Sequence, residues 1–182
     1  MGENEVLHCL KSQQENVQAV CISGGEPTLQ YNLEAFIKSL KEMGFFVKIN
    51  TAGCDPQMIN NLIENERVDY ISLDIKNSWE EYYKITQMST DGDLKNFQES
   101  LRLVQASDIE HEYNTTILPA VHEEKNFFTI AGYLNKGEKY YIQRLANHEA
   151  LKQAIHLENA INIPMLIGKL RQSFPELIIK VR

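Results

Sequence analysis

Short apolar runs rich in β-branched residues alternate along this chain with longer segments of helical periodicity. Such runs are typical of buried strands, and the intervals between them are long enough to hold crossover helices. We therefore expect an α/β protein with a parallel sheet and right-handed crossovers, either an open doubly wound sheet or a partial barrel. Periodicity alone does not choose between the two. The expected strands are residues 17–23, 46–50, 70–74, 113–118, 140–145 and 177–181.

Start and stop signals define the helices between these strands. An amphipathic segment ends at Gly44, a residue that tolerates a left-handed cap. Asp55 is followed by proline, the arrangement of an N-cap carboxylate before the first helical position. Ser78 and Glu81 form a capping-box pattern for a short helix over residues 79–85. Further helices are expected over 33–43, 94–104, 127–134 and 161–174, and the stretch 147–162 is left open between helix and loop.

Length, charge and cysteine content bound the possible functions. A chain of 182 residues, 43% of them hydrophobic, forms one substantial core, so we expect a single domain over residues 1–182. The net charge of -7 argues against binding to nucleic acid or to an anionic membrane, because these partners carry the same sign. Neither a signal peptide nor a long apolar run is present, and we expect a cytoplasmic protein. The cysteines are expected to be reduced thiols in or near the core, and the histidines lack a zinc-binding spacing.

The first expected strand runs directly into a flexible acidic turn. Ligands collect at the carboxyl ends of parallel strands, which makes this turn a candidate site. Gly24 and Gly25 let the backbone approach a ligand, and Glu26 offers a carboxylate to a cationic or donor-rich group. Two plainer interpretations stay open. The glycines form a simple strand-to-helix turn, or the Glu26 side chain only caps the following helix.

Polar side chains also follow the other expected strands, so we expect them to share one rim with the acidic turn. Asn50 and Thr51 supply neutral donors and acceptors after the second strand. Asp74 and Lys76 stand two residues apart and point to one face, where they pair with each other or bind the opposite ends of a zwitterion. An ordinary surface ion pair is the alternative for these two residues. Gln143 stands near the end of the fifth strand.

In order and spacing, these motifs resemble the radical S-adenosylmethionine enzymes. Within that superfamily the chain is most similar to activating proteins of anaerobic ribonucleoside-triphosphate reductase, followed by pyruvate formate-lyase activating enzymes. The resemblance runs from about residue 17 to the C-terminus and implies a partial (β/α)6 TIM-like barrel. The motifs are Ser23-Gly24-Gly25-Glu26-Pro27-Thr28-Leu29-Gln30, Asn50-Thr51-Ala52-Gly53, Tyr70-Ile71-Ser72-Leu73-Asp74-Ile75-Lys76 and Tyr140-Tyr141-Ile142-Gln143.

The resemblance also implies a role for each motif. The Gly-Gly-Glu turn binds the methionine ammonium group of S-adenosylmethionine, and residues after the second and third strands line the carboxylate and ribose of that cofactor. Backbone carbonyls and a carboxylate suit an ammonium group, because it has three donors to satisfy. The family often has aspartate where Asn50 stands. The cofactor-binding residues implied in this way are Ser23, Gly24, Gly25, Glu26, Pro27, Thr28, Asn50, Thr51, Asp74, Lys76 and Gln143.

The largest departure from the family concerns its 4Fe-4S cluster. Family members hold the cluster through a Cys-x3-Cys-x2-Cys loop, whereas this chain has Cys9, Cys21 and Cys54. We therefore expect that the first βα unit is missing, that residues 1–16 are a remnant helix or disordered, and that the chain alone is inactive. The alternatives are a truncated gene, a misassigned start codon and a degenerate homologue that retains binding. Truncation is favoured because the other motifs are kept.

Two functional hypotheses follow. The first is a radical S-adenosylmethionine activating enzyme that generates a glycyl radical on anaerobic ribonucleotide reductase or a related glycyl radical enzyme, with a separate electron donor. The second is a noncatalytic module that binds S-adenosylmethionine or docks on a partner. An isomerase or aldolase is a weaker third hypothesis, because no catalytic base is placed for it. The exposed edge of the first strand also predicts a dimer or low solubility.

Overall fold

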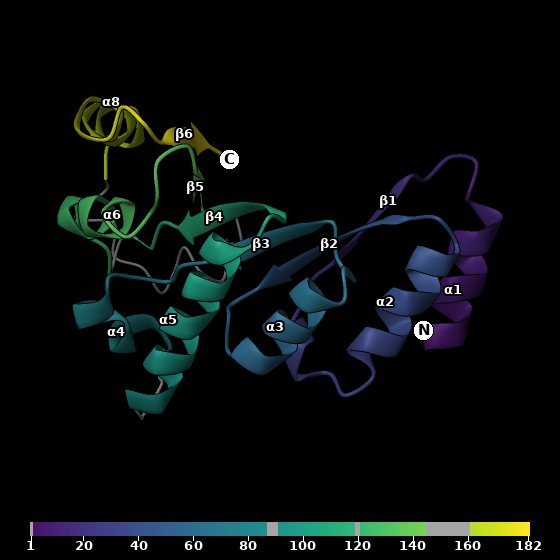
Figure 1. The fold of residues 1–182 in the computed structure, drawn as a ribbon. Coiled ribbons are helices and arrows are strands. Elements are labelled where there is room, and N and C mark those ends of the chain that lie inside the picture. Colours follow the sequence, from purple (N-terminus) through teal and green to yellow (C-terminus); the bar gives the residue numbers. More distant parts are fainter. Residues whose placement is uncertain (1, 87–90, 119–120, 145–160) are drawn as a thin grey trace, which may run out of the picture. The chain divides into compact units, whose positions relative to one another are not determined.

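The computed structural model describes residues 2–86, 91–118, 121–144 and 161–182 (Figure 1). Its sheet has the strand order β1-β2-β3-β4-β5-β6. The chain forms two compact units, which we call unit 1 (Met1–Leu73 with Lys95–His111) and unit 2 (Asp74–Leu94 with Glu112–Arg182). Within the described ranges, no helix combines the length and the apolar character that crossing a membrane requires.

Unit 1 alternates strands and helices, as the sequence predicts. Helices α1 and α2 lie side by side in it (Figure 1). The last residue of strand β3 and the first turn of helix α5 belong to unit 2, whereas the rest of both elements belongs to unit 1. The elements are α1 (Glu3–Ser12), β1 (Ala19–Ile22), η1 (Pro27–Leu29), α2 (Leu33–Glu42), β2 (Phe46–Thr51), α3 (Pro56–Glu64), β3 (Tyr70–Asp74) and α5 (Asp91–Ala106).

Strand β2 lies between two parallel neighbours in unit 1. Ile49 stands beside Ile22 of β1 and beside Ile71 of β3. Val47 and Ile49 are buried, whereas Lys48 between them is partly exposed. Because successive side chains of a strand point to opposite faces, one face of β2 packs into the core and the other carries polar groups.

Local capping signals in unit 1 act as the sequence predicts. Ile37 and Leu40 of α2 are fully buried, and the helix gives way to Gly44. The Asp55 carboxylate accepts a hydrogen bond from the Met58 backbone N–H at 3.0 Å, which confirms the predicted N-cap of α3.

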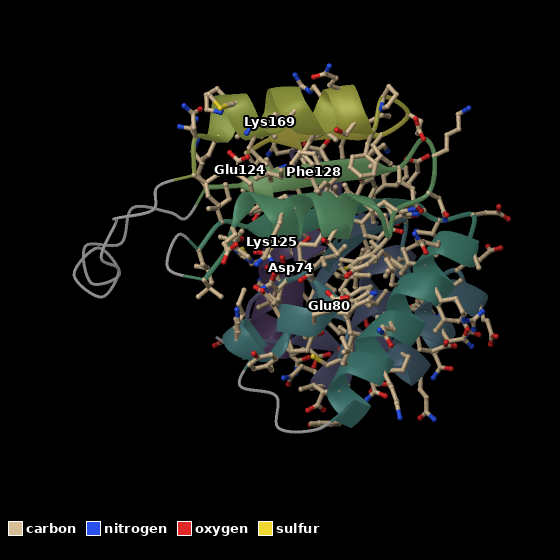
Figure 2. The ribbon with its side chains drawn as sticks, turned by 90° about the vertical axis from the view of Figure 1, so that its left-hand side faces the viewer. Asp74, Glu80, Glu124, Lys125, Phe128 and Lys169 are labelled. Atoms are coloured by element: carbon tan, nitrogen blue, oxygen red, sulfur yellow. The ribbon has the colours of Figure 1, made fainter. Side chains whose placement is uncertain are left out.

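Unit 2 continues the same alternation. Tyr113 of β4 stands beside Tyr140 of β5 in parallel register, and both side chains are fully buried. On the helical side, the Lys169 ammonium of α8 donates to the Glu124 carboxylate of α6 at 2.6 Å (Figure 2). The elements are η2 (Trp79–Glu81), α4 (Tyr83–Thr86), β4 (Glu110–Thr116), α6 (Glu124–Ala131), β5 (Lys139–Gln143), α8 (Ile163–Ser173) and β6 (Ile178–Val181).

Three sequence predictions need correction or fall outside the described residues. The capping box at Ser78 is wrong, because the Ser78 hydroxyl makes no cap and instead accepts a hydrogen bond from the Asn126 amide at 3.3 Å. The placement of the cysteines in the core is wrong for Cys9 and Cys21, which are both exposed. The segment 147–162, left open between helix and loop, lies mostly outside the described residues.

Candidate cofactor-binding site

The turn after β1 adopts a backbone conformation that only glycine occupies without strain. Gly24 and Gly25 have φ angles of 91° and 53°, in the left-handed region. A Cβ atom added to either glycine would meet no heavy atom within 4 Å, so open space surrounds both residues. The glycines are therefore needed for the shape of the turn, and that shape leaves its backbone accessible to a ligand.

The Glu26 carboxylate ties this turn to the turn after β2. Its Oε1 accepts hydrogen bonds from the Thr28 N–H at 3.1 Å, the Thr28 hydroxyl at 2.6 Å and the Thr51 hydroxyl at 2.6 Å. Its Oε2 accepts one from the Ala52 N–H at 2.7 Å. Glu26 caps η1 through the Thr28 N–H, whereas the N-cap of the following helix α2 is Asn32. The carboxylate also joins two strand ends, which a cap alone would not do.

Several residues of these two turns are buried. Pro27, Thr28 and Thr51 are all buried, so these three predicted cofactor residues lie under the accessible surface. The Thr51 hydroxyl also accepts a hydrogen bond from the Gly53 N–H at 3.0 Å. Gly53 has a φ of 71°, and an added Cβ would lie 3.0 Å from the Phe97 ring. The turn after β2 therefore depends on a glycine for both its backbone conformation and its packing.

Asn50 lies beside the Gly-Gly-Glu turn with an unused acceptor. Its side-chain amide nitrogen approaches the Ser23 hydroxyl at 3.5 Å. Its Oδ1 is buried and has no hydrogen-bond partner among the described residues. A buried oxygen without a donor is unfavourable, so a ligand that offers an N–H or O–H group would stabilise it. Ser23, Glu26, Asn50 and Thr51 are thus brought together in unit 1.

The remaining predicted residues lie in unit 2. Asp74 and Lys76 form an ion pair, and their side chains are 30% and 36% exposed. The ion pair that the surface-pair alternative requires is therefore present in the structure, and both side chains are also exposed enough to contact a ligand. Gln143 lies on β5, where its amide nitrogen donates to Asn114 at 3.2 Å and its oxygen accepts from Thr116 at 3.2 Å.

Sequence reasoning missed a buried charged pair on β4. Glu112 is only 2% exposed and accepts two hydrogen bonds from the Arg182 guanidinium, at 2.6 and 2.8 Å. The guanidinium lies 3.8 Å from the centre of the Tyr141 ring. Residues 110–116 are polar apart from Tyr113, so the sequence carries no polar-apolar alternation that would have identified this strand face.

The three cysteines lie on separate parts of the fold. Cys9 lies in α1, Cys21 in β1, and Cys54 after β2, and the described residues contain no group of three or more His, Cys, Asp or Glu side chains that could hold a metal ion. The turn after β1 fits S-adenosylmethionine, because its open backbone, its carboxylate and the unpaired Asn50 oxygen are acceptors that an ammonium group requires.

Solved structures show the same fold. A domain of pyruvate-formate lyase-activating enzyme from Bacteroides vulgatus superposes with a TM-score of 0.63 at 16% identity, covering 90% of this chain and 98% of that one. Streptococcus suis SuiB bound to S-adenosylmethionine gives a TM-score of 0.72 at 10% identity, covering the whole of this chain and 44% of SuiB. These matches confirm the α/β fold class that the sequence predicts.

The sequence comparisons define the family. The model of the Radical SAM superfamily matches residues 3–129, and this chain therefore belongs to the radical S-adenosylmethionine superfamily. A Methanocaldococcus jannaschii protein, provisionally named as a glycyl-radical enzyme activating enzyme, is 35% identical over 135 residues. The match covers 72% of this chain and 56% of that relative, so the chain spans little more than half of its length. The resemblance to activating enzymes is thereby confirmed.

Proposed function

We propose that this chain is the S-adenosylmethionine-binding part of a radical enzyme that activates a glycyl radical enzyme. Anaerobic ribonucleoside-triphosphate reductase is the partner that the sequence motifs favour, with a separate electron donor. The observation that carries the proposal is the turn after β1, where two glycines with positive φ leave open space beside the Glu26 carboxylate. Cofactor and cluster together supply the radical chemistry in this family. The residues of this chain supply binding and orientation.

The turn after β1 offers acceptors for the cofactor's ammonium group. Oε1 of Glu26 already accepts three hydrogen bonds, whereas Oε2 accepts one and has capacity for a second. The accessible backbone of Gly24 and Gly25 and the unpaired Oδ1 of Asn50 add further acceptors. In unit 2, Asp74 and Lys76 match motif positions that line the cofactor's carboxylate and ribose, and Gln143 is a further candidate for its polar groups.

A noncatalytic binding module is the second candidate function. The observation in its favour is the spacing of Cys9, Cys21 and Cys54, which does not match the Cys-x3-Cys-x2-Cys ligand loop of the family. Both candidates require S-adenosylmethionine binding, and they differ in whether this chain takes up a cluster. We place the protein in the cytoplasm, in keeping with its free cysteines.

A dimer through β1 belongs to the same proposal. Strand β1 is the first in the strand order and pairs only with β2 within the described part of the sheet, which leaves the other edge of its backbone open. Strand β6 differs, because the Arg171 guanidinium donates two hydrogen bonds to the Ile179 carbonyl, at 3.0 and 2.7 Å. A charged side chain therefore blocks part of the β6 backbone, and β1 is the edge that a second copy would use.

Calorimetry tests the binding step directly. We expect the purified chain to bind S-adenosylmethionine, and to bind methylthioadenosine more weakly because that compound lacks the ammonium and carboxylate. When S-adenosylmethionine binding is measured for Glu26→Gln, Glu42→Gln serves as the control variant, because Glu42 is 66% exposed and its carboxylate lies 3.8 Å from Lys38. Absence of binding, or equal affinity for the two compounds, would overturn the proposal. Anaerobic incubation with iron and sulfide then separates the candidates, since cluster uptake supports the activating enzyme and its absence supports the module.

A further inference from the structure

Three residues of the segment 76–79, which follows β3, are held by the region around α6. The Lys76 carbonyl accepts a hydrogen bond from the His122 ring, and the Ser78 hydroxyl accepts one from Asn126. The Trp79 N–H donates to the Tyr133 hydroxyl at 3.0 Å, and these two rings stack at 3.9 Å with an interplanar angle of 4°. Between them, Asn77 is fully buried and donates to the Glu81 carbonyl at 3.2 Å.

His122 is held in one protonation state by its two partners. Its Nδ1 accepts a hydrogen bond from the Leu118 N–H at 2.9 Å, so Nδ1 carries no proton. Its Nε2 therefore carries the hydrogen and donates to the Lys76 carbonyl at 2.8 Å. The side chain is 3% exposed and packs 5.2 Å from the Phe127 ring. A neutral imidazole with no unused nitrogen fixes the backbone at Lys76.

Asn126 makes the second connection between α6 and this segment. Its amide nitrogen donates to the Ser78 hydroxyl at 3.3 Å and to the Glu81 carboxylate at 3.1 Å. Its oxygen accepts from the Glu123 N–H at 2.7 Å, within the capping box of α6. Asn126 is 1% exposed, so its side-chain amide is shielded from water. Figure 2 labels Lys125 on α6 and Glu80 on η2, the two elements that the network joins.

We propose that His122 and Asn126 are positioning residues, which hold the backbone of residues 76–79 so that the Lys76 ammonium is presented at the end of β3 for an anionic ligand group. This inference rests on the proposed role of Lys76 in cofactor binding. Lysine has a long side chain with many rotamers, and a fixed backbone removes one source of that freedom before the ligand arrives. The Asp74 carboxylate, which pairs with Lys76, restricts the side chain further.

Two substitutions at His122 separate its two hydrogen bonds. In His122→Gln the amide nitrogen replaces Nε2 and still donates to the Lys76 carbonyl. In His122→Asn the amide oxygen replaces Nδ1 and keeps only the Leu118 contact. Both variants lose the ring, so their stabilities are comparable. Loss of one net hydrogen bond predicts that His122→Asn weakens S-adenosylmethionine binding by about 5- to 10-fold, with less than about 2-fold for His122→Gln.

A double-mutant comparison shows whether His122 acts through Lys76. In a Lys76→Met background, His122→Asn should cause no further loss of affinity, although it lowers the urea midpoint as it does alone. Equal effects of the two His122 variants, or a full additional loss of affinity in the Lys76→Met background, would overturn the inference and leave His122 with a role in stability only.

Hydrogen exchange gives a readout that needs no ligand. We expect faster exchange of the Ser78 and Trp79 amides in His122→Asn than in His122→Gln, because the Ser78 N–H donates to the Asn77 side chain and the Trp79 N–H donates to the Tyr133 hydroxyl. Unchanged exchange in both variants would refute the positioning role. If exchange changes as expected but the unmodified chain binds no S-adenosylmethionine, the positioning role stands and the proposed function fails.

Discussion

Replacement of Glu26 by glutamine tests whether its carboxylate holds two strand ends together. The best arrangement for glutamine keeps its oxygen at the Oε1 position, where three donors meet, and places its NH2 group against the Ala52 N–H. Two donors then face each other. The contact with Ala52 is lost, and the other three hydrogen bonds no longer have a charged acceptor.

The magnitude follows from those hydrogen bonds. A hydrogen bond to a charged group contributes about 1.5–3 kcal/mol, and an unpaired buried donor costs about 1–3 kcal/mol. Because these terms are not additive and Glu26 is partly exposed, we expect Glu26→Gln to lower the free energy of unfolding by about 2–4 kcal/mol. Thr51→Val removes the partner hydroxyl and leaves the Gly53 N–H unpaired, for an expected loss of about 1–3 kcal/mol.

Urea unfolding followed by circular dichroism measures these changes. Glu42→Gln is the matched control, because its exposed ion pair with Lys38 predicts a change below about 0.5 kcal/mol. The double variant Glu26→Gln/Thr51→Val should lose less than the sum of the single losses, since both remove the same contact. Two results would contradict this role of the carboxylate. Either Glu26→Gln would be no less stable than Glu42→Gln, or the loss of unfolding free energy in the double variant would equal the sum of the two single losses.

Three further predictions concern other parts of the chain. Gly53→Ala should lower the free energy of unfolding by about 2–4 kcal/mol, because φ is 71° and the new methyl would lie 3.0 Å from both Leu73 and Phe97. The thermal midpoint should fall with it, and an unchanged midpoint would contradict this packing. Burial lowers the pKa of His122 from about 6.5, so the unfolded state binds the proton more readily. Stability should therefore fall as pH drops below about 6.5, and His122→Gln should flatten the difference between urea midpoints at pH 7.5 and 5.5. Light scattering should show a concentration-dependent dimer that Cys21→Lys on the β1 edge weakens, and a monomer at all concentrations would argue against pairing through β1.

The elements of the fold were predictable because their signals are local. The strand over residues 70–74 has the predicted bounds, and Asp55 caps α3 as expected. A cap joins residues three apart, and strand or helix periodicity is carried by residues within a few positions of each other. The sequence therefore contains these signals whatever the tertiary structure does.

The contacts that organise the site were harder to predict from the sequence, because their partners are far apart in the chain. Ser78 has the pattern of a capping box, yet its hydroxyl bonds to Asn126, 48 residues away. Glu26 meets Thr51 across 25 residues, and only the register of β1 and β2 brings these two together. The sequence pattern singled out Ser78 as a helix cap and Glu26 as a candidate ligand-binding residue, and tertiary packing then decided what each of them binds.

The double role of Glu26 changes how a loss of cofactor affinity in Glu26→Gln should be interpreted. One oxygen of the carboxylate is filled by three protein donors, and the other still has room for a ligand donor. Weaker S-adenosylmethionine binding by Glu26→Gln would therefore follow either from a lost contact with the ammonium group or from a loosened turn. Thr51→Val separates these causes, because it loosens the tie and leaves the carboxylate in place. Equal losses of affinity in the two variants would assign the effect to the tie, whereas intact binding by Thr51→Val would assign it to direct contact.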